Sequence, residues 1–333
     1  MICVMLRLAL SALSALVACA TLAAQNFPLV IVEKKAGAVG FYSPAGQRLA
    51  GVKIGEYPHE IVLAPDGRTA YISDNGILWM QNAGEGGNTI SIVDVKSRTK
   101  LGTIDLGKNR RPHGLALDAK RNRLLSTTEN PDGLLLMDLN TRKVVRRYDV
   151  QGEDPHMVML SPDGETAFVS NTTTSTIAAI HLESGKTKLI PTDKRPQGGV
   201  LSKDGKLIYM TNSDGNSITI LDVARQENIG RIDTGKGPNR IALTPDGKTL
   251  VYSMLADETF GFVDIAARRQ TLTVKLPGPP LSMTMLPDGA YAFVGVQDHD
   301  TVVVVSVPER KIVKTFKTPA GAGPDPVLAL AAR

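Results

Sequence analysis

The chain has 333 residues, of which 42% are apolar, and a formal net charge of +5. This length suits one large β-domain or two smaller domains, and either can bury a substantial core. No run of Lys or Arg exceeds two residues. The composition therefore excludes the clustered basic surface of a nucleic-acid-binding protein, and we expect no nucleic-acid partner.

The first 24 residues differ from the rest of the chain. They contain one Arg, an apolar stretch from Leu8 to Val17 and then several small residues. This layout is typical of an export signal and is too short to span a bilayer. We expect a signal peptide over residues 1–24, a periplasmic or extracellular location, and a single domain over residues 25–333.

Two processing routes remain open for that segment. The small residues before Gln25 offer cleavage sites for a soluble form, whereas "LVAC", ending at Cys19, resembles a lipobox and would leave a lipid anchor. Cys3 and Cys19 are the only cysteines. The predicted mature domain therefore has no disulfide and no thiol nucleophile.

A repeat organises everything downstream of this segment. Prolines recur 41 to 54 residues apart, at Pro58, Pro112, Pro155, Pro196, Pro238, Pro280 and Pro324. Each complete unit continues from its proline with a short apolar run, a turn, a second run ending in "YIS" or similar, a polar loop and two further runs. A period of this length with four short strands indicates the blades of a β-propeller.

The turn after the first strand of each unit has a recognisable chemistry. "PDG" occurs at 65–67, 162–164, 245–247 and 287–289, with "KDG" at 203–205, and in these turns Pro sets φ and Gly accepts φ > 0. In the second unit "DAKRNR" replaces this turn. Runs such as "NTISIVDV" and "NSITILDV" alternate at the period of β-strands.

The two ends of the repeat region complete one unit between them. Residues 28–55 predict three strands without a first strand, and residues 323–332 predict a first strand without its partners. Six complete units lie between them. We therefore predict an all-β, seven-bladed β-propeller of four-stranded antiparallel blades, closed by three N-terminal strands and one C-terminal strand.

The second strands carry a family resemblance. "YISDN" (71–75), "FVSNT" (168–172) and "YMTNS" (209–213) stand where YVTN-type propeller repeats show Tyr-Val-Thr-Asn, and the resemblance covers nearly all of residues 28–333. It implies an exported propeller related to lactonases, lyases, electron-transfer partners, surface-layer components or binding scaffolds. Such a fold does not by itself decide an activity.

The residue after each proline is expected at the mouth of the central channel, because each proline begins an innermost strand. Around the ring these residues are His59, His113, His156, Gln197, Asn239, Leu281 and Asp325. Three imidazoles from consecutive blades suit a divalent metal site. The alternative is that each ring hydrogen-bonds the backbone of a neighbouring blade, and the sequence leaves both open.

Other polar and aromatic residues join this expected site. Glu60 is the candidate catalytic base, and Glu129 and Arg240 are candidates for acid, base or anion clamp, or for salt bridges between blades. The long loop over residues 73–88 holds Trp79, the only Trp, as a lid over the channel or as packing against a blade. The predicted ligand-binding set is Gln197, Asn239, Arg240, Glu129, Trp79 and Asp325.

Three functions are consistent with these features. The first is an exported, monomeric propeller that binds a small molecule, glycan or protein partner at the channel mouth. The second is a metal-assisted hydrolase or lyase, for example a lactonase, with His59, His113 and His156 holding the ion and Glu60 as base. The third is a redox partner of a cofactor-bearing protein. The sequence has no nucleophile elbow, phosphate loop or haem-attachment motif.

Overall fold

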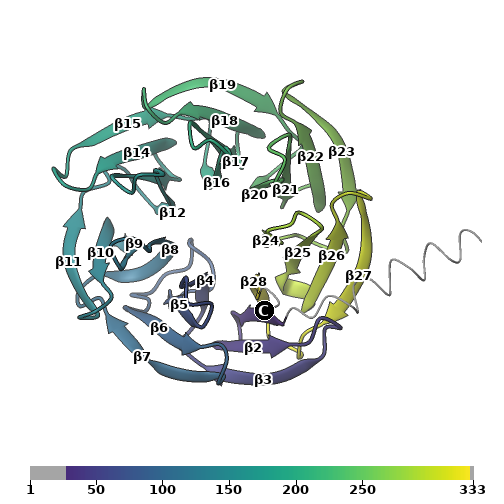
Figure 1. The fold of residues 1–333 in the computed structure, drawn as a ribbon, viewed down its shortest axis with the longest axis horizontal. Helices are drawn as coiled ribbons and strands as arrows, with labels where there is room; N and C mark the ends of the chain where they lie inside the picture. The colour runs from purple at the N-terminus through teal and green to yellow at the C-terminus, as the bar shows by residue number, and fades with distance from the viewer. Residues whose placement is uncertain (1–27, 331–333) are drawn as a thin grey trace, which may run out of the picture.

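The computed structural model describes residues 28–330 and shows seven four-stranded antiparallel sheets arranged around a central channel (Figure 1). The predicted signal peptide and Cys19 lie outside the described residues. Within that part of the chain, no helix is long and apolar enough to cross a membrane. The seven sheets confirm the predicted seven-bladed propeller.

The strands fall into four concentric groups. The innermost strands are β4 (Pro58–Leu63), β8 (Arg110–Asp118), β12 (Pro155–Leu160), β16 (Pro196–Leu201), β20 (Pro238–Leu243), β24 (Ser282–Met285) and β28 (Pro324–Ala329). The second strands are β5 (Thr69–Asp74), β9 (Arg123–Asn130), β13 (Thr166–Asn171), β17 (Leu207–Asn212), β21 (Thr249–Met254), β25 (Tyr291–Val296) and β1 (Leu29–Glu33).

The outer half of each blade follows the same order. The third strands are β6 (Thr89–Asp94), β10 (Asp132–Asp138), β14 (Thr176–His181), β18 (Ser217–Asp222), β22 (Thr259–Asp264), β26 (Thr301–Ser306) and β2 (Ala38–Tyr42). The outermost strands are β7 (Thr99–Asp105), β11 (Lys143–Tyr148), β15 (Thr187–Pro191), β19 (Glu227–Asp233), β23 (Arg269–Lys275), β27 (Lys311–Lys317) and β3 (Arg48–Lys53). A single 3-10 turn, η1 (Gln297–His299), follows β25 among the described residues.

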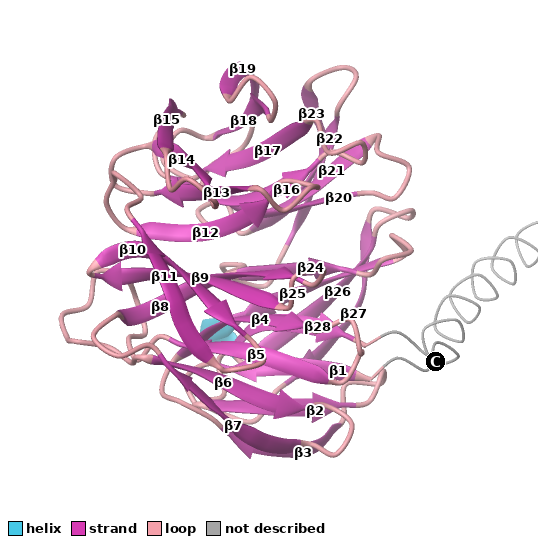
Figure 2. Ribbon diagram, turned by 60° about the vertical axis from the view of Figure 1, so that its left-hand side comes forward, coloured by secondary structure: helices cyan, strands magenta, loops and turns pink. Residues whose placement is uncertain are grey.

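The ring closes as the two ends of the repeat predicted. One sheet has the order β28-β1-β2-β3, and Ile31 of β1 pairs antiparallel with Val327 of β28 (Figures 1 and 2). Pairing the two ends in one sheet leaves no blade incomplete. It also makes closure of the ring depend on a contact that spans nearly the whole chain.

The predicted turns form for the reasons expected. In the turn before β5, Gly67 has φ 63° and Asp66 Oδ1 accepts the backbone N–H groups of Arg68 and Thr69. In the second blade Asp118 takes this role, accepting the N–H of Arg121 at the turn that lacks Pro-Asp-Gly. The substitution therefore changes one turn and leaves the blade intact.

A Ser or Thr near the end of the second strand joins neighbouring blades at three places, Thr127, Ser170 and Thr211. Thr127 Oγ1 accepts the N–H of Gly114 at 2.8 Å and donates to the carbonyl of His156 in the next blade at 2.7 Å. Thr211 repeats the pattern, accepting from Gly198 and donating to the carbonyl of Asn239. A buried hydroxyl thus fixes the backbone of the residue after the next proline, which is the position that faces the channel mouth.

The backbone before most of the repeat prolines also helps to aim that position. The preceding residue has a positive φ in six of the seven blades, at Tyr57, Arg111, Asp154, Arg195, Gly237 and Gly323. This left-handed turn redirects the chain from the outer strand of one blade into the inner strand of the next. Two inner strands differ from the expectation: β8 begins before Pro112, and β24 begins after Pro280, where Pro279 and Pro280 remove two ladder donors.

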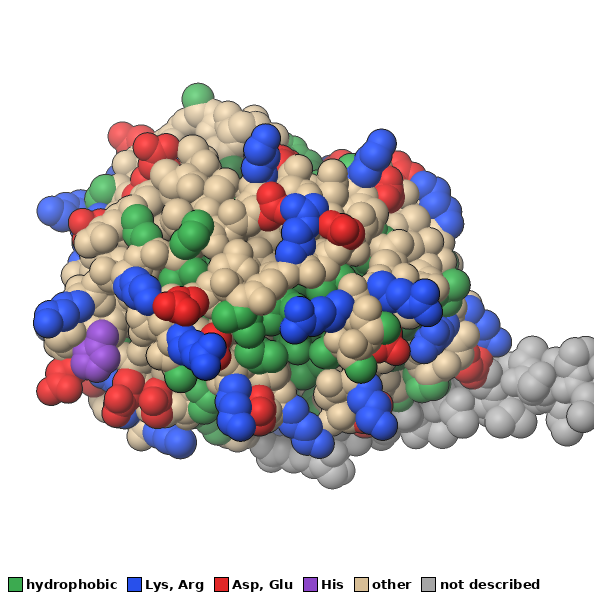
Figure 3. Space-filling view, turned by 90° about the horizontal axis from the view of Figure 1, so that it is seen from above, with side chains coloured by type: hydrophobic (Ala, Val, Ile, Leu, Met, Phe, Trp, Pro, Cys, Tyr) green, Lys and Arg blue, Asp and Glu red, His purple; other side chains and the backbone are tan. Residues whose placement is uncertain are grey.

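The core lies between adjacent sheets rather than inside one. Phe260 and Phe262 of β22, with ring centroids 5.3 Å apart, pack in one cluster with Val303 of β26 in the next blade. Each blade thereby covers the bare face of its neighbour. On the outer side of the ring, positive and negative side chains are interspersed (Figure 3).

Candidate functional site

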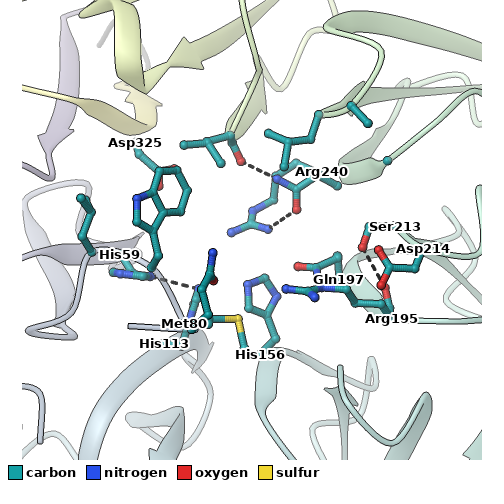
Figure 4. Close-up of a pocket in the computed structure, with 18 of the residues that line it drawn as sticks. His59, Met80, His113, His156, Arg195, Gln197, Ser213, Asp214, Arg240 and Asp325 are labelled. Atoms are coloured by element: carbon teal, nitrogen blue, oxygen red, sulfur yellow. Dashed lines mark hydrogen bonds between the residues drawn. The ribbon is translucent and has the colours of Figure 1, made fainter. Parts of the chain in front are cut away.

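A cavity of about 570 Å³ opens at the face where the repeat prolines and the second-to-third-strand loops meet (Figure 4). Eight of the ten predicted site residues line it: His59, His113, His156, Gln197, Asn239, Arg240, Trp79 and Asp325. The remaining two, Glu60 and Glu129, stand behind lining residues. The repeat register therefore brings the predicted side chains together.

The histidines of the first two blades form a hydrogen-bonded chain. His59 Nε2 lies 2.8 Å from the carbonyl oxygen of Ile77, and His59 Nδ1 lies 3.3 Å from His113 Nε2. His113 Nδ1 lies 2.7 Å from Glu129 Oε1. All three side chains are buried, with 4% or less of His113 and Glu129 exposed.

Which atom donates and which accepts in this chain follows from the groups at its two ends, the Ile77 carbonyl and the Glu129 carboxyl group. A carbonyl only accepts, so His59 Nε2 carries a proton and, in the neutral ring, Nδ1 accepts from His113 Nε2–H. The short contact between His113 Nδ1 and Glu129 then needs a proton of its own. The His113–Glu129 pair therefore holds one proton, either as a neutral imidazole with a carboxylic acid or as an imidazolium with a carboxylate.

Burial shapes the electrostatics of the chain. Desolvation lowers the pKa of His59 and of His113 well below 6.5, and neighbouring positive groups lower it further. Desolvation also raises the pKa of Glu129 to about 7, against the opposing charge of Arg111, whose Nε lies 3.2 Å from Glu129 Oε2. Both shifts favour uncharged groups at the cavity floor.

His156 packs next to His113 but does not belong to this hydrogen-bonded chain. Its ring centroid lies 4.1 Å from that of His113, and its own ring is hydrogen-bonded to the backbone of Gln197. That bond raises the pKa of His156, so the ring donates to the Gln197 carbonyl, and the donor is Nε2 because Nδ1 makes no hydrogen bond within the described residues. Nδ1 is buried and has no partner within residues 28–330. Desolvation, the largest effect, lowers the pKa of His156 well below 6.5, so Nδ1 is a free acceptor.

The predicted metal site does not fit this arrangement. The nitrogens of His59 and His113 are engaged with each other, with Ile77 and with Glu129, which leaves only His156 Nδ1 available among the three rings. Across residues 28–330, no group of three or more His, Cys, Asp or Glu is placed to hold a metal ion. A tetrahedral zinc site needs several such free donors. The metal assignment stays a prediction.

Glu60 and Arg240 form a salt bridge across the channel. Arg240 Nη2 donates to Glu60 Oε1 at 2.6 Å, with about one-eighth of each side chain exposed. Arg240 also lines a second cavity of about 220 Å³ deeper in the channel, which Glu60 lines as well. The bridge thus lies between the two cavities. Desolvation raises the pKa of Glu60, and Arg240 opposes this shift.

Lys34, Asp325 and Trp79 form another part of the cavity wall. Lys34 Nζ donates to Asp325 Oδ2 at 3.2 Å and lies 5.7 Å from the centre of the Trp79 ring. Asp325 Oδ1 is buried and has no partner in the described chain. Asn239 is committed elsewhere, since its Nδ2 donates to the Leu281 carbonyl at 2.8 Å.

The long loop after β5 is anchored to the ring. His59 contacts the carbonyl of Ile77, and Arg111 Nη2 donates to the carbonyl of Met80 at 2.7 Å. Ile77 is buried, whereas Trp79 is partly exposed and lines the cavity. Ile77 thus packs into the protein and Trp79 lines the cavity, and the lid role of Trp79 stays a prediction.

Three cations of the site were not singled out from the sequence. Lys34 follows β1, Arg195 directly precedes Pro196, and Lys236 lies two residues before Pro238. The signal for Arg195 and Lys236 is their place at the entry to an inner strand. His181 lies at the end of β14, hydrogen-bonded to Ser184, and does not line this cavity.

Comparison with known proteins supports the fold and does not establish an activity. No family model matches the chain, so the resemblance to YVTN-type repeats is not confirmed. The uncharacterized protein YncE of Salmonella typhimurium strain LT2 is 25% identical over 206 residues, which cover 59% of this chain and 54% of the relative. The chain thus spans about half the length of the curated relatives it matches.

Two solved structures share the architecture. The periplasmic gluconolactonase PpgL of Pseudomonas aeruginosa superposes with a TM-score of 0.75 at 16% identity, over 92% of this chain and 99% of its own. The dihydro-heme d1 dehydrogenase NirN, in complex with DHE, gives a TM-score of 0.66 at 16% identity, over 91% and 75%. At this level of identity the likeness shows that the chain has a seven-bladed β-propeller fold with gluconolactonase-like and YncE-like neighbours.

Proposed function

We propose that this propeller binds an anionic small molecule in the cavity at its channel mouth. The observation that carries the proposal is the charge of the lining. Four cations, Lys34, Arg195, Lys236 and Arg240, face two carboxylates, Asp214 and Asp325. Burial lowers the pKa values of the three lining histidines, which favours their neutral forms.

Arg195 and Lys236 are the cations available to a ligand. Both are exposed at the rim, and within residues 28–330 neither has a carboxylate partner at salt-bridge distance. Lys34 and Arg240 are already paired with Asp325 and Glu60. Unpaired cations in a cavity that the apolar ring of Trp79 also lines suit a carboxylate or phosphate on an organic body.

The proposal is tested by binding of carboxylates and phosphates to the purified protein, followed by calorimetry and thermal shift. The double variant Arg195→Ser/Lys236→Ser is expected to weaken binding roughly tenfold at low salt, where two screened charge contacts are lost. A matched control, Lys203→Ser/Lys206→Ser, removes two exposed lysines at the opposite face and leaves binding unchanged. Equal affinity in both double variants contradicts the proposal.

A second candidate is hydrolysis or elimination on a lactone-like substrate. It is supported by the His113–Glu129 pair, which holds one proton beside the cavity with the pKa of Glu129 at about 7. Such a pair suits general acid–base catalysis. The predicted base, Glu60, is instead paired with Arg240 and does not line the upper cavity.

This candidate is tested by hydrolysis of glucono-δ-lactone above the spontaneous rate. The rate enhancement should be lost in Glu129→Gln and in His113→Ala if the pair acts on the substrate. Elemental analysis of the purified protein tests the metal hypothesis in parallel. This hypothesis requires one ion per chain and the loss of that ion in His113→Ala. No enhancement over buffer would remove the candidate.

Export forms part of the same proposal. It rests on the signal-like composition of residues 1–24. Fractionation of cells that express the full chain, with mass spectrometry of the mature N-terminus, distinguishes the soluble form from a lipidated Cys19. Recovery of the unprocessed chain in the cytoplasm contradicts export.

A further inference from the structure

We infer that the ligand of the channel-mouth cavity is a hydroxylated anion, whose hydroxyl groups donate to Asp325 Oδ1 and His156 Nδ1. The inference rests on the proposed function and adds the chemistry of the ligand's body to that of its charge. It starts from the two lining side chains that keep a buried, unpartnered acceptor within residues 28–330.

Asp325 supplies the first acceptor. The side chain is 7% exposed, and its Oδ2 is taken by Lys34 at 3.2 Å, while Oδ1 has no donor. A buried carboxylate oxygen without a donor is costly, because it has lost its hydration without a replacement. A ligand that brings an O–H group to this atom removes that cost on binding.

His156 supplies the second acceptor from another wall of the cavity. Its ring projects toward the middle of the site, well apart from Asp325 (Figure 4). Because the bond to the Gln197 backbone places the proton on Nε2, Nδ1 presents a lone pair. The two atoms therefore demand donors at two separate points of one ligand.

The charge of the cavity decides which donor fits. An ammonium group also donates, but the lining already carries four cations against two carboxylates, and Lys34 neutralises Asp325. A cationic group on the ligand would be repelled by this field. A hydroxyl group donates without adding charge, and the anionic part of the same molecule reaches Arg195 and Lys236 at the rim.

The experiment compares ring carboxylates with and without hydroxyl groups by calorimetry. The probes are D-glucuronate, cyclohexanecarboxylate and methyl β-D-glucoside, which carry both features, the anion alone and the hydroxyls alone. We expect D-glucuronate to bind more tightly than cyclohexanecarboxylate by roughly tenfold or more, since each hydrogen bond contributes about threefold to tenfold. The glucoside should bind weakest.

Two variants locate that preference. His156→Phe keeps a ring but removes the acceptor, while the Gln197 carbonyl still accepts from Ser170 Oγ at 3.0 Å. Asp325→Asn keeps the shape and replaces the carboxylate. Each variant should lose threefold to tenfold of the glucuronate preference, taken as the ratio of the two affinities, because losing the charge of Asp325 strengthens the binding of both carboxylates. Asp214→Asn is the matched control, because Asp214 also lines the cavity but is exposed.

The outcomes separate the inference from the proposed function. Equal affinity for the two carboxylates, or a preference that survives in both His156→Phe and Asp325→Asn, overturns the inference and leaves anion binding intact. Absence of binding by both carboxylates overturns the proposed function itself. Thermal unfolding of each variant confirms that it is folded before its affinities are compared.

Discussion

The imidazole of His113 and the carboxyl group of Glu129 share one proton across a 2.7 Å contact, buried beneath the channel mouth. Two groups elsewhere in the sequence, the Ile77 carbonyl and the His59 ring, determine where this proton can lie. The carbonyl of Ile77 fixes the proton of His59, and His59 in turn fixes that of His113. The pair is the titratable element of the site whose protonation changes near neutral pH.

The first prediction concerns Glu129→Gln, whose amide can donate to His113 without titrating. The pKa of Glu129 is raised from 4.5 to about 7 in the folded protein, so its stabilising contribution is full below pH 4.5 and is lost as pH rises through about 7. The stability of the wild type relative to Glu129→Gln should therefore fall across this window. The expected loss is steepest between these two pKa values, at on the order of 1 kcal/mol per pH unit, and levels off above pH 7.

The measurement is thermal unfolding of both proteins at intervals from pH 5 to pH 8. The variant serves as its own control for the other titrating groups, because these remain in both proteins. Parallel profiles for wild type and Glu129→Gln would show that the pair does not hold the proton.

The second prediction concerns acid lability from the buried histidines. Burial lowers the pKa values of His59, His113 and His156 well below 6.5, so each favours folding above pH 6.5 and this stabilisation is lost as pH falls below it. His156→Phe should flatten the acid side of the stability profile by up to about 1.4 kcal/mol per pH unit. Chemical unfolding at pH 7.0, 6.0 and 5.0 measures the slope, and an unchanged slope contradicts the assignment.

The sequence predicted the positions of the three histidines well, and the reason is the repeat. His59, His113 and His156 occupy one position of the blade, so a correct register places them at one mouth whatever the details of their packing. The seven blades and the shared closing sheet follow from the same counting of strands. Local turn chemistry and periodicity are sufficient for this level of prediction.

Several partners of the site's side chains could not be predicted, because they depend on contacts between blades or on irregular pairing within one blade. Glu60 and Arg240 are 180 positions apart and meet only once all blades are in place. Glu129 lies on β9 and reaches His113 of β8 in the same blade, where the pairing of the two strands is irregular between Pro112 and Leu115. Sequence spacing carries no information on any of these distances.

The third prediction concerns the hydroxyl that joins the second and third blades. Thr127→Val keeps the shape of the side chain but leaves the N–H of Gly114 and the carbonyl of His156 without this partner. We expect a loss of about 1–3 kcal/mol, a fall in Tm of roughly 2 to 6 °C. Thr127→Ser retains the hydroxyl and should lose less. Equal Tm values for the two variants, measured by calorimetry, would exclude a role for the hydroxyl.

The fourth prediction concerns the bridge across the channel between Glu60 and Arg240. Removing one partner leaves the other charge buried, so Glu60→Leu alone and Arg240→Met alone should each cost about 3–5 kcal/mol. The double variant replaces both charges with apolar groups in a channel that Ile61, Met157 and Met283 already line, and it should recover most of the loss. Chemical unfolding of all four proteins gives the coupling energy directly. Additive single losses would mean that the two charges act independently and that solvent, rather than the bridge, satisfies each of them.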